Sequence, residues 1–241
     1  MLEELPASRV FRANLEFLRP DPKLIAEFAT IPAANISDAG GNLNTLDSGI
    51  QAVVPGCRIC GPACTVNTRA GDFLAILRGL HAARAGDVLV ISNQASPDVA
   101  VFGGITATEA KLKGLSGLVT DGKVRDIEEI RKLNFPVFAR GTTPRVAGRG
   151  SLGEVNVPIQ CGGVVVEPGD IVVGDADGVV VIPRQKAPEI LRLAQDIVRF
   201  EEALVKKVRA GLSQVEFFKL DAQFEDLVRT HLKGHGELGE P

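Results

Sequence analysis

The chain is poor in several residue types that mark well-known kinds of site. Its three histidines, His81, His231 and His235, are scattered, and the last two lie in a polar C-terminal stretch. A histidine-centred triad or a histidine-rich metal site is therefore not expected. Positive charge is not in excess either, because 27 Lys and Arg stand against 30 Asp and Glu. We expect no nucleic-acid partner, since nucleic-acid-binding domains carry a basic surface.

Long apolar runs are also absent. Residues 1–5 lack the basic start and the apolar core of a signal peptide, and no stretch is long enough to cross a bilayer. The sequence therefore predicts a cytoplasmic protein with no membrane partner. Hydrophobic residues nevertheless make up 45% of the 241 positions, and the mean hydropathy is +0.14. Such a chain can build a substantial core.

Only four cysteines occur, and three of them, Cys57, Cys60 and Cys64, are close together. Their spacing is similar to part of a zinc site, which is one interpretation. The surrounding strand-like residues and Gly/Pro turns favour the other interpretation, in which these residues and Cys161 are small buried thiols.

Hydrophobic periodicity predicts alternating strands and helices in the middle of the chain. We expect paired strands within 49–66, helices over 72–85, 98–113 and from 126 onward, and strands at 86–91, 117–120 and 137–140. This alternation is typical of a parallel sheet with crossover helices. Residues 169–183 differ, because two β-branched runs flank Asp/Gly turns and predict an antiparallel hairpin.

From residue 185 the composition changes. Apolar residues at helical spacing predict a long amphipathic helix that is broken at Gly211, and a weaker helical segment over about 214–232. The sequence therefore predicts an α/β domain over residues 1–184 and a C-terminal helical extension over residues 185–241.

The most informative segment is Thr120-Asp121-Gly122-Lys123-Val124-Arg125-Asp126, where a strand gives way to a helix. We expect Arg125 and Asp126 in the first helical turn. Free backbone N–H groups and the positive end of the helix dipole favour an anionic ligand and a carboxylate-held metal there. The alternative is structural, with Asp126 capping the helix and Arg125 pairing with Glu129 one turn on.

Several motifs together resemble one known family. They are Ile36-Ser37-Asp38-Ala39, Gly103-Gly104, residues 114–126, Pro136-Val137-Phe138-Ala139-Arg140-Gly141 and Gly174-Asp175-Ala176-Asp177-Gly178-Val179. The chain resembles, over about residues 30–185, the family of the regulator of ribonuclease activity A, which also contains metal-dependent 4-hydroxy-4-methyl-2-oxoglutarate aldolases. The resemblance implies a β/β/α swivelling-type sandwich with mixed sheets, a homotrimer or hexamer, and sites between adjacent subunits.

The resemblance also implies a catalytic motif. In the aldolases this motif is an aspartate, twenty intervening residues, Arg-Asp, two residues and an acidic residue. The chain matches Arg125, Asp126 and Glu129, but Gly104 stands where the first aspartate is expected. That aspartate is expected to help place the metal's water shell and the proton donor. Gly104 therefore indicates a different 2-oxo acid, a carboxylate supplied from elsewhere, or no aldolase activity.

The metal implied by the resemblance is Mg²⁺ or Mn²⁺. Asp126 is the expected direct ligand, with Glu129 or Asp121 in contact with the metal's waters. Asp121 also suits an ordinary Asp-Gly turn, and we slightly favour that interpretation. Asp175 and Asp177 are predicted to be turn residues rather than metal ligands.

The expected substrate is a small 2-oxo acid that is cleaved or decarboxylated to give pyruvate. Backbone N–H groups around Gly103, Gly104, Ile105 and Thr106 would hold its carboxylate. Arg125 would stabilise the enolate that forms, so Arg125 and Asp126 are the predicted catalytic residues.

Three further interpretations stay open. Lys123 could form a Schiff base in a metal-independent aldolase. Glu201 or Glu202 could reach a neighbouring subunit's site, as a family glutamate does, although we favour a solvated helix face for both. A non-catalytic regulator that binds a ribonuclease, like the family's founding member, is the alternative from a different class. Gly104 favours that regulator, whereas the long C-terminal helix is more similar to the aldolases.

Overall fold

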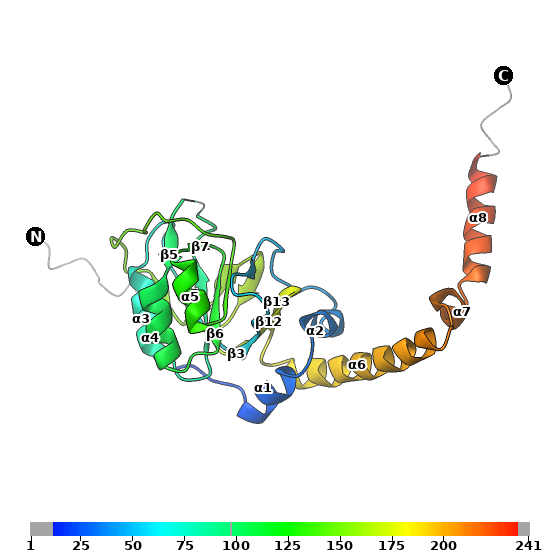
Figure 1. The fold of residues 1–241 in the computed structure, drawn as a ribbon, viewed down its shortest axis with the longest axis horizontal. Helices are drawn as coiled ribbons and strands as arrows, with labels where there is room; N and C mark the ends of the chain where they lie inside the picture. The colour runs from blue at the N-terminus through cyan, green and yellow to red at the C-terminus, as the bar shows by residue number, and fades with distance from the viewer. Residues whose placement is uncertain (1–11, 97, 236–241) are drawn as a thin grey trace, which may run out of the picture. The chain divides into compact units, whose positions relative to one another are not determined.

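The computed structural model describes residues 12–96 and 98–235 (Figure 1). Contacts within the chain divide it into two compact units, residues 1–195 and residues 196–241. Helix α6 (Ala187–Arg209) begins just after the predicted boundary at 184/185, and the division between the units falls inside this helix. The part of α6 in the first unit buries an apolar face that consists of Ala187, Ile190, Leu191 and Ala194.

A mixed sheet forms the centre of the first unit. Its strands follow the order β1-β9-β3-β4-β6-β8-β2, and β12 joins it beside β3. Four neighbouring strands run parallel, as the alternation predicted: β3 (Ile59–Asn67), β4 (Val88–Ser92), β6 (Gly117–Thr120) and β8 (Val137–Ala139). They are almost continuously buried, which is typical of parallel strands covered on both faces.

The other strands lie at the edges of this sheet or form short ribbons. Strands β1 (Arg12–Ala13) and β2 (Gln51–Ala52) are the ends of the strand order, and β9 (Glu154–Val155) lies between β1 and β3. The ribbons are β5 (Ala100–Phe102) with β7 (Lys123–Val124) and β10 (Ile159–Cys161) with β11 (Val164–Val166). The predicted hairpin is confirmed, because β12 (Ile171–Asp175) and β13 (Gly178–Ile182) pair antiparallel. Asp175 and Asp177 lie at its turn, as predicted, and Asp175 accepts hydrogen bonds from the N–H groups of Asp177 and Ala33.

Two predictions about the strands are wrong. Strand β2 pairs with β8 rather than with β3, because a turn with Gly56 at a φ of 69° separates β2 from β3 and the Val53 N–H donates to Val137. The predicted helix over 98–113 begins with a strand. Residues 100–102 are buried and pair with β7, so this pairing overrides the helical composition until Gly103.

Three helices connect the parallel strands and lie close together in Figure 1. They are α3 (Leu74–Ala82), α4 (Gly104–Leu112) and α5 (Ile127–Leu133), while α1 (Pro22–Phe28) and α2 (Ala33–Ala39) lie between β1 and β2 in the chain. Helix α3 packs closely on β3, since a Cβ at Gly79 would lie 2.2 Å from the Val66 Cγ2. The motif Ile36-Ser37-Asp38-Ala39 forms the end of α2.

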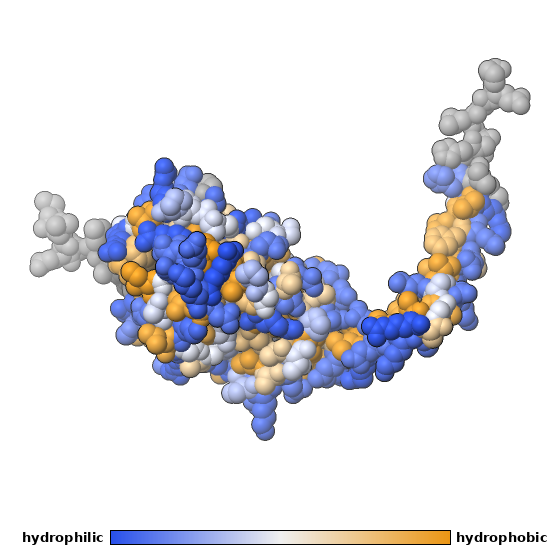
Figure 2. Space-filling model, viewed as in Figure 1, coloured by the Kyte–Doolittle hydropathy of each residue, from blue (hydrophilic) through white to orange (hydrophobic). Residues whose placement is uncertain are grey.

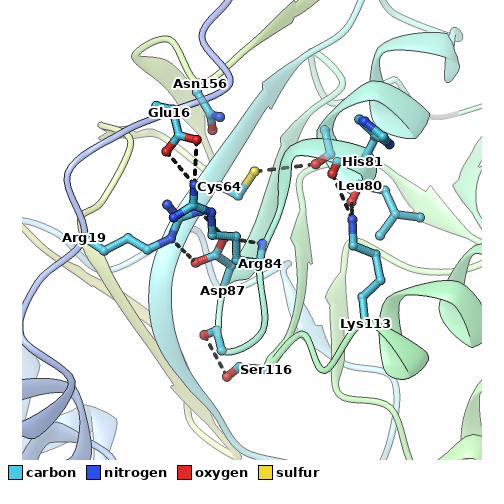
Figure 3. A network of polar contacts seen from close by, with 12 residues as sticks. Glu16, Arg19, Cys64, Leu80, His81, Arg84, Asp87, Lys113, Ser116 and Asn156 are labelled. Carbon is cyan, nitrogen blue, oxygen red and sulfur yellow. Dashed lines mark hydrogen bonds and ion pairs between the residues drawn. The ribbon is translucent and has the colours of Figure 1, made fainter.

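A buried carboxylate attaches the N-terminal segment to the first unit (Figure 3). Asp87 has a fully buried side chain, and its oxygens accept hydrogen bonds from Arg19 Nε at 2.8 Å and Nη2 at 2.7 Å. The Arg84 N–H donates to the same carboxylate at 2.8 Å. The Arg84 guanidinium itself pairs with Glu16 at the surface. This network holds residues 16–19 against the turn that precedes β4.

Three of the four cysteines are buried thiols, as the second interpretation predicted. Cys57, Cys64 and Cys161 are buried, whereas Cys60 is half-buried, and none of the four forms a disulfide. Burial raises the pKa of the Cys60 and Cys64 thiols to about 12, so both stay protonated at neutral pH.

The second unit consists of helices. It contains the rest of α6, then α7 (Gln214–Phe218) and α8 (Asp221–His235), so the predicted segment over 214–232 is two helices separated at Lys219, which has a φ of 54°. Apolar side chains remain exposed along this unit, as the orange atoms in Figure 2 show, and they include Phe218, Phe224, Leu227 and Val228. No helix in the described part of the chain has both the length and the apolar character needed to span a membrane.

Candidate functional site

Arg125 and Asp126 lie between β7 and α5. The prediction that both belong to the first helical turn is wrong, because α5 begins at Ile127 and Asp126 occupies the preceding position with φ 56° and ψ 44°. The structural alternative is also wrong. The Asp126 side chain does not cap α5, and Arg125 pairs with Asp126 itself, with Nε 3.4 Å from Oδ2.

The carboxylate of Asp126 is held by a different helix. Its Oδ2 accepts a hydrogen bond from the Gly104 N–H, the first residue of α4, at 3.0 Å. The first-turn N–H groups of a helix have no acceptor within that helix, and they include those of Ile105 and Thr106. The Thr106 hydroxyl accepts from the Gly103 N–H at 3.0 Å and orders this turn. The start of α4 therefore binds one carboxylate already and suits a further anion.

Other side chains pack closely against the two glycines at this helix start. A Cβ at Gly103 would lie 2.6 Å from Asp126 Oδ2 and 3.0 Å from Arg125 Cγ, so only glycine allows the carboxylate this approach. A Cβ at Gly104 would lie 3.2 Å from the Cβ and 3.4 Å from the Cγ of Glu129. Glu129 of α5 therefore fills the space beside the position where the aldolase motif has its aspartate.

These groups open into a cavity of about 280 Å³, which we call the apolar cavity. Its walls come from β5, from the starts of α3 and α4, and from the segment after β8. The side chains of Arg125 and Asp126 are 38% and 41% exposed, so both charges are accessible to a ligand. The lining residues are Phe73, Leu77, Ala100, Val101, Phe102, Gly103, Ile105, Thr106, Arg125, Asp126, Val146 and Arg149.

Sequence reasoning did not identify Arg149. Its guanidinium carbon lies 4.8 Å from the centre of the Phe73 ring, in a cation–π contact at the cavity wall. Arg149 lies in a segment without regular secondary structure, so no periodicity pointed to it. Two cations, Arg125 and Arg149, therefore face one carboxylate, Asp126, and this balance favours an anionic ligand.

Other predicted site residues lie elsewhere. Asp121 lines a different cavity, and its carboxylate accepts from the Asn93 N–H at 2.6 Å. Burial raises the pKa of the Asp121 carboxyl, although backbone donors at Asn93 and Ala95 oppose this shift. Glu129 is exposed and lies beside Gly104, next to the residues that line the apolar cavity but not among them, and Lys123 of β7 is also outside the lining. The structure thus brings together Arg125, Asp126 and the start of α4, but not Asp121.

Asp126 is the side chain of the apolar cavity that could hold a hard divalent cation, which would arrive together with an anionic substrate. Mg²⁺ is usually held by one or two carboxylates, by waters and by oxygens of the substrate. Among the described residues that line the cavity, Asp126 is the one acidic side chain, and the bond from Gly104 fixes its orientation. Nowhere in residues 12–96 and 98–235 do three or more His, Cys, Asp or Glu form a group that could hold a metal ion. Any metal here would therefore depend on waters and substrate for most of its ligands.

A comparison with family models decides the family. The model described as "RraA-like: Aldolase/RraA" matches residues 33–181, more than half of the chain. The chain belongs to the RraA-like family. The RraA-like match includes the start of α4, Arg125 and Asp126, and most of the parallel sheet.

Individual relatives of this RraA-like chain agree with the match. A protein of Halalkalibacterium halodurans named "Putative 4-hydroxy-4-methyl-2-oxoglutarate aldolase" is 42% identical over 194 residues, which are 80% of this chain and 92% of that protein. A crystal structure of an uncharacterized protein from Pseudomonas syringae is 30% identical with a TM-score of 0.74, and the match covers 82% of this chain and 97% of that one.

A third relative is titled as a regulator. The crystal structure of Streptomyces coelicolor RraAS2, described as an unusual member of the RNase ES inhibitor RraA protein family, is 33% identical with a TM-score of 0.71. The match covers 78% of this chain and 98% of that one. Together these structures confirm the predicted fold class, a mixed α/β sandwich followed by a C-terminal helix.

Proposed function

We propose that this RraA-like protein is a lyase that depends on a divalent cation and releases pyruvate from a small 2-oxo acid, by retro-aldol cleavage or by decarboxylation of the oxaloacetate type. The observation that carries the proposal is the meeting of Arg125, Asp126 and the start of α4 at one cavity. The relative from H. halodurans, whose name assigns it to the aldolases, supports the same chemistry.

The residues of the chain have distinct roles in this reaction. Mg²⁺ or Mn²⁺ at Asp126 would polarise the substrate's keto group. First-turn N–H groups at Ile105 and Thr106 bind the substrate carboxylate, in the way helix N-termini bind anions. Arg125 stabilises the negative charge that develops on the keto oxygen, an effect of about 2.7–4 kcal/mol for a comparable donor. The apolar wall around Phe102 keeps water from the enolate.

Glu129 supplies the carboxylate that Gly104 lacks. An aspartate side chain at position 104 would start 3.2 Å from the Glu129 Cβ, so the two side chains would compete for one space. The absence of a side chain at Gly104 leaves this space to Glu129. Glu129 is therefore a positioning residue for the metal's waters and for the proton that the enolate receives. Its substitution by Gln is expected to shift the pH dependence of kcat, which a structural role alone would not do.

Turnover measurements test the proposal. Pyruvate release is measured from oxaloacetate and from 4-hydroxy-4-methyl-2-oxoglutarate, with Mg²⁺ and with EDTA, for the wild type, Arg125→Ala and Asp126→Ala. We expect metal-dependent turnover that both substitutions abolish. Lys123→Ala is the matched control, because it keeps turnover if the metal is used and loses it if Lys123 forms a Schiff base. Absence of turnover on both substrates would contradict the proposal as stated.

The assembly is proposed to be a homotrimer or a hexamer with sites between subunits, to which Glu201 or Glu202 of α6 contributes. Light scattering after size exclusion measures the oligomer directly. A fully active monomer would overturn the intersubunit site.

A second candidate function is the binding of a ribonuclease. The S. coelicolor relative, titled as a member of an RNase ES inhibitor family, supports it, and so does Gly104 in the aldolase motif. Binding of the purified chain to a ribonuclease of this type, measured by calorimetry, separates the two functions. The regulator is expected to bind without any dependence on Asp126, and the lyase is expected to turn over substrate without binding the ribonuclease.

A further inference from the structure

Polar side chains at the carboxyl ends of the parallel strands line a second cavity. They are Asn67 at the end of β3, Ser92 at the end of β4, Asp121 after β6 and Arg140 after β8. The volume is about 550 Å³, and the β10–β11 ribbon contributes Gln160 and its glycine turn. We call this space the polar cavity. It shares no described lining residue with the apolar cavity.

Its place in the fold is one where ligands commonly bind. In open α/β sheets the crevice outside the carboxyl ends of the strands is the usual binding position. The lyase proposed above does not use this edge of the sheet. The polar cavity therefore has no role in that reaction.

Arg140 presents part of its guanidinium to the polar cavity, because its side chain is 31% exposed. Its Nη1 donates to Asp47 Oδ1 at 3.0 Å, and its backbone N–H donates to the Gly122 carbonyl. Its Nε is buried, so a ligand in the cavity would bind the exposed part of the guanidinium. Planar guanidinium groups bind carboxylates well, often through two parallel hydrogen bonds.

Asp121 provides the opposite charge in the same cavity. Its side chain is 5% exposed, and backbone N–H groups at Asn93 and Ala95 hold its carboxylate. Gln94 and Ala95 take the left-handed conformation, with φ of 51° and 49°, which is uncommon for residues other than glycine. An uncommon loop conformation thus surrounds Asp121 at the cavity wall, as is often found at binding sites.

These charges limit the kind of ligand. A phosphate or a dicarboxylate would place negative charge beside Asp121, and a polyamine would place positive charge beside Arg140. The other polar side chains that line the cavity carry no charge, and they are Asn67, Ser92, Gln94 and Gln160. A small molecule with one carboxylate and one ammonium group matches both charges.

We propose that the polar cavity binds a free α-amino acid as its zwitterion, with the carboxylate accepting from Arg140 and the ammonium group donating to Asp121. Saturation-transfer NMR of the full chain with pools of the twenty common L-amino acids is the first test. Any amino acid that binds is then measured by calorimetry beside its amine, which lacks the carboxylate, and its acid, which lacks the ammonium group. We expect binding of the zwitterion at least tenfold tighter than that of either analogue.

Substitutions in the two cavities test where the amino acid binds. Arg140→Gln and Asp121→Asn are each expected to weaken amino-acid binding at least tenfold. Gln160→Ala, at an exposed position of the cavity lining, is the test if either of these variants fails to fold. Arg125→Gln in the apolar cavity is the matched control and is expected to leave binding unchanged.

Three results would overturn the proposal. The first is that no amino acid binds. The second is that the acid alone binds as tightly as the zwitterion. The third is that pyruvate or Arg125→Gln removes the binding, which would place the ligand in the apolar cavity.

Discussion

Asp87 and Asp126 are both paired with an arginine and with a backbone N–H, but their surroundings differ. The Asp87 side chain is fully buried, and Arg19 lies 2.7 to 2.8 Å from its two oxygens. The Asp126 side chain is 41% exposed, and Arg125 lies 3.4 Å away. A carboxylate whose oxygens are all engaged by its own chain stabilises the fold, while one that is held at a single oxygen can still bind a ligand or a metal.

The largest expected effect is on the buried pair. Replacing Arg19 by Met leaves Asp87 without its cationic partner in a buried position, and we expect the free energy of unfolding to fall by about 3 kcal/mol. Urea denaturation followed by circular dichroism measures this loss. Arg84→Met is the matched control within the same network (Figure 3), because the Arg84–Glu16 pair is exposed and is expected to contribute less than about 1 kcal/mol. Equal losses in both variants would remove the distinction between the buried and the exposed pair.

The exposed pair is expected to behave in the opposite way. Arg125→Met should lower kcat for pyruvate release by about 10²–10³-fold, because the developing enolate loses its cation. The free energy of unfolding should change by less than about 0.5 kcal/mol, as for other exposed positions. Arg131→Met, at an exposed position of α5, is the control and should leave kcat unchanged. A large loss of stability in Arg125→Met would show that this pair supports the fold after all.

A smaller effect is expected from moving the Asp126 carboxylate without changing any charge. Gly103→Ala places a methyl group 2.6 Å from Oδ2, so the carboxylate must shift, and misplacement of a reacting group by about 1 Å can cost about 10²-fold in rate. The measurement is kcat together with the Mg²⁺ concentration at half-maximal rate. Gly40→Ala is the matched control, since its Cβ would meet no atom closer than 3.4 Å. Unchanged kinetics in Gly103→Ala would contradict the assigned position of the carboxylate.

The smallest expected effect concerns a second buried carboxyl, that of Asp170. Burial raises the pKa of Asp170, although hydrogen bonds from the N–H groups of Glu167 and Arg184 oppose the shift. Between the ordinary carboxyl pKa and the raised one, the folded chain holds a proton that the unfolded chain has released. Stability should therefore fall as pH rises through this interval.

Asp170→Asn should reduce that fall. The difference in unfolding free energy between the wild type and the variant, measured by denaturation from pH 3.5 to pH 7, isolates the contribution of Asp170. A difference that does not vary with pH would contradict the prediction.

Much of the fold followed from local pattern, and the exceptions have physical causes. The alternation of apolar strands and amphipathic helices predicted the four parallel strands, because a strand buried on both faces must be apolar throughout. Strand β5 was missed because Ala, Leu and Lys after residue 103 gave the whole segment a helical composition. Its pairing with β7 is a tertiary contact that composition does not encode.

The candidate site, like the fold, could be predicted from the sequence only in part. Arg125 and Asp126 could be predicted because they follow a strand in a motif whose chemistry is visible in the residues themselves. The hydrogen bond from Gly104, the contact of Glu129 with position 104, and Arg149 at the cavity wall all join segments that are distant in sequence. The separation of Asp121 from Asp126 could not be predicted either, because β7 runs between them and carries the chain from one cavity to the other.

The left-handed backbone conformation of Asp126 restricts which amino-acid substitutions can test the role of its carboxylate. Asparagine and aspartate adopt this conformation more readily than other residues with a side chain, whereas alanine carries a steric penalty. Asp126→Ala therefore alters the chain direction at the start of α5 as well as removing the charge, and Asp126→Asn removes the charge alone. The same constraint means that few amino acids can replace Asp126 without disturbing the junction of β7 and α5, even where no catalysis is required.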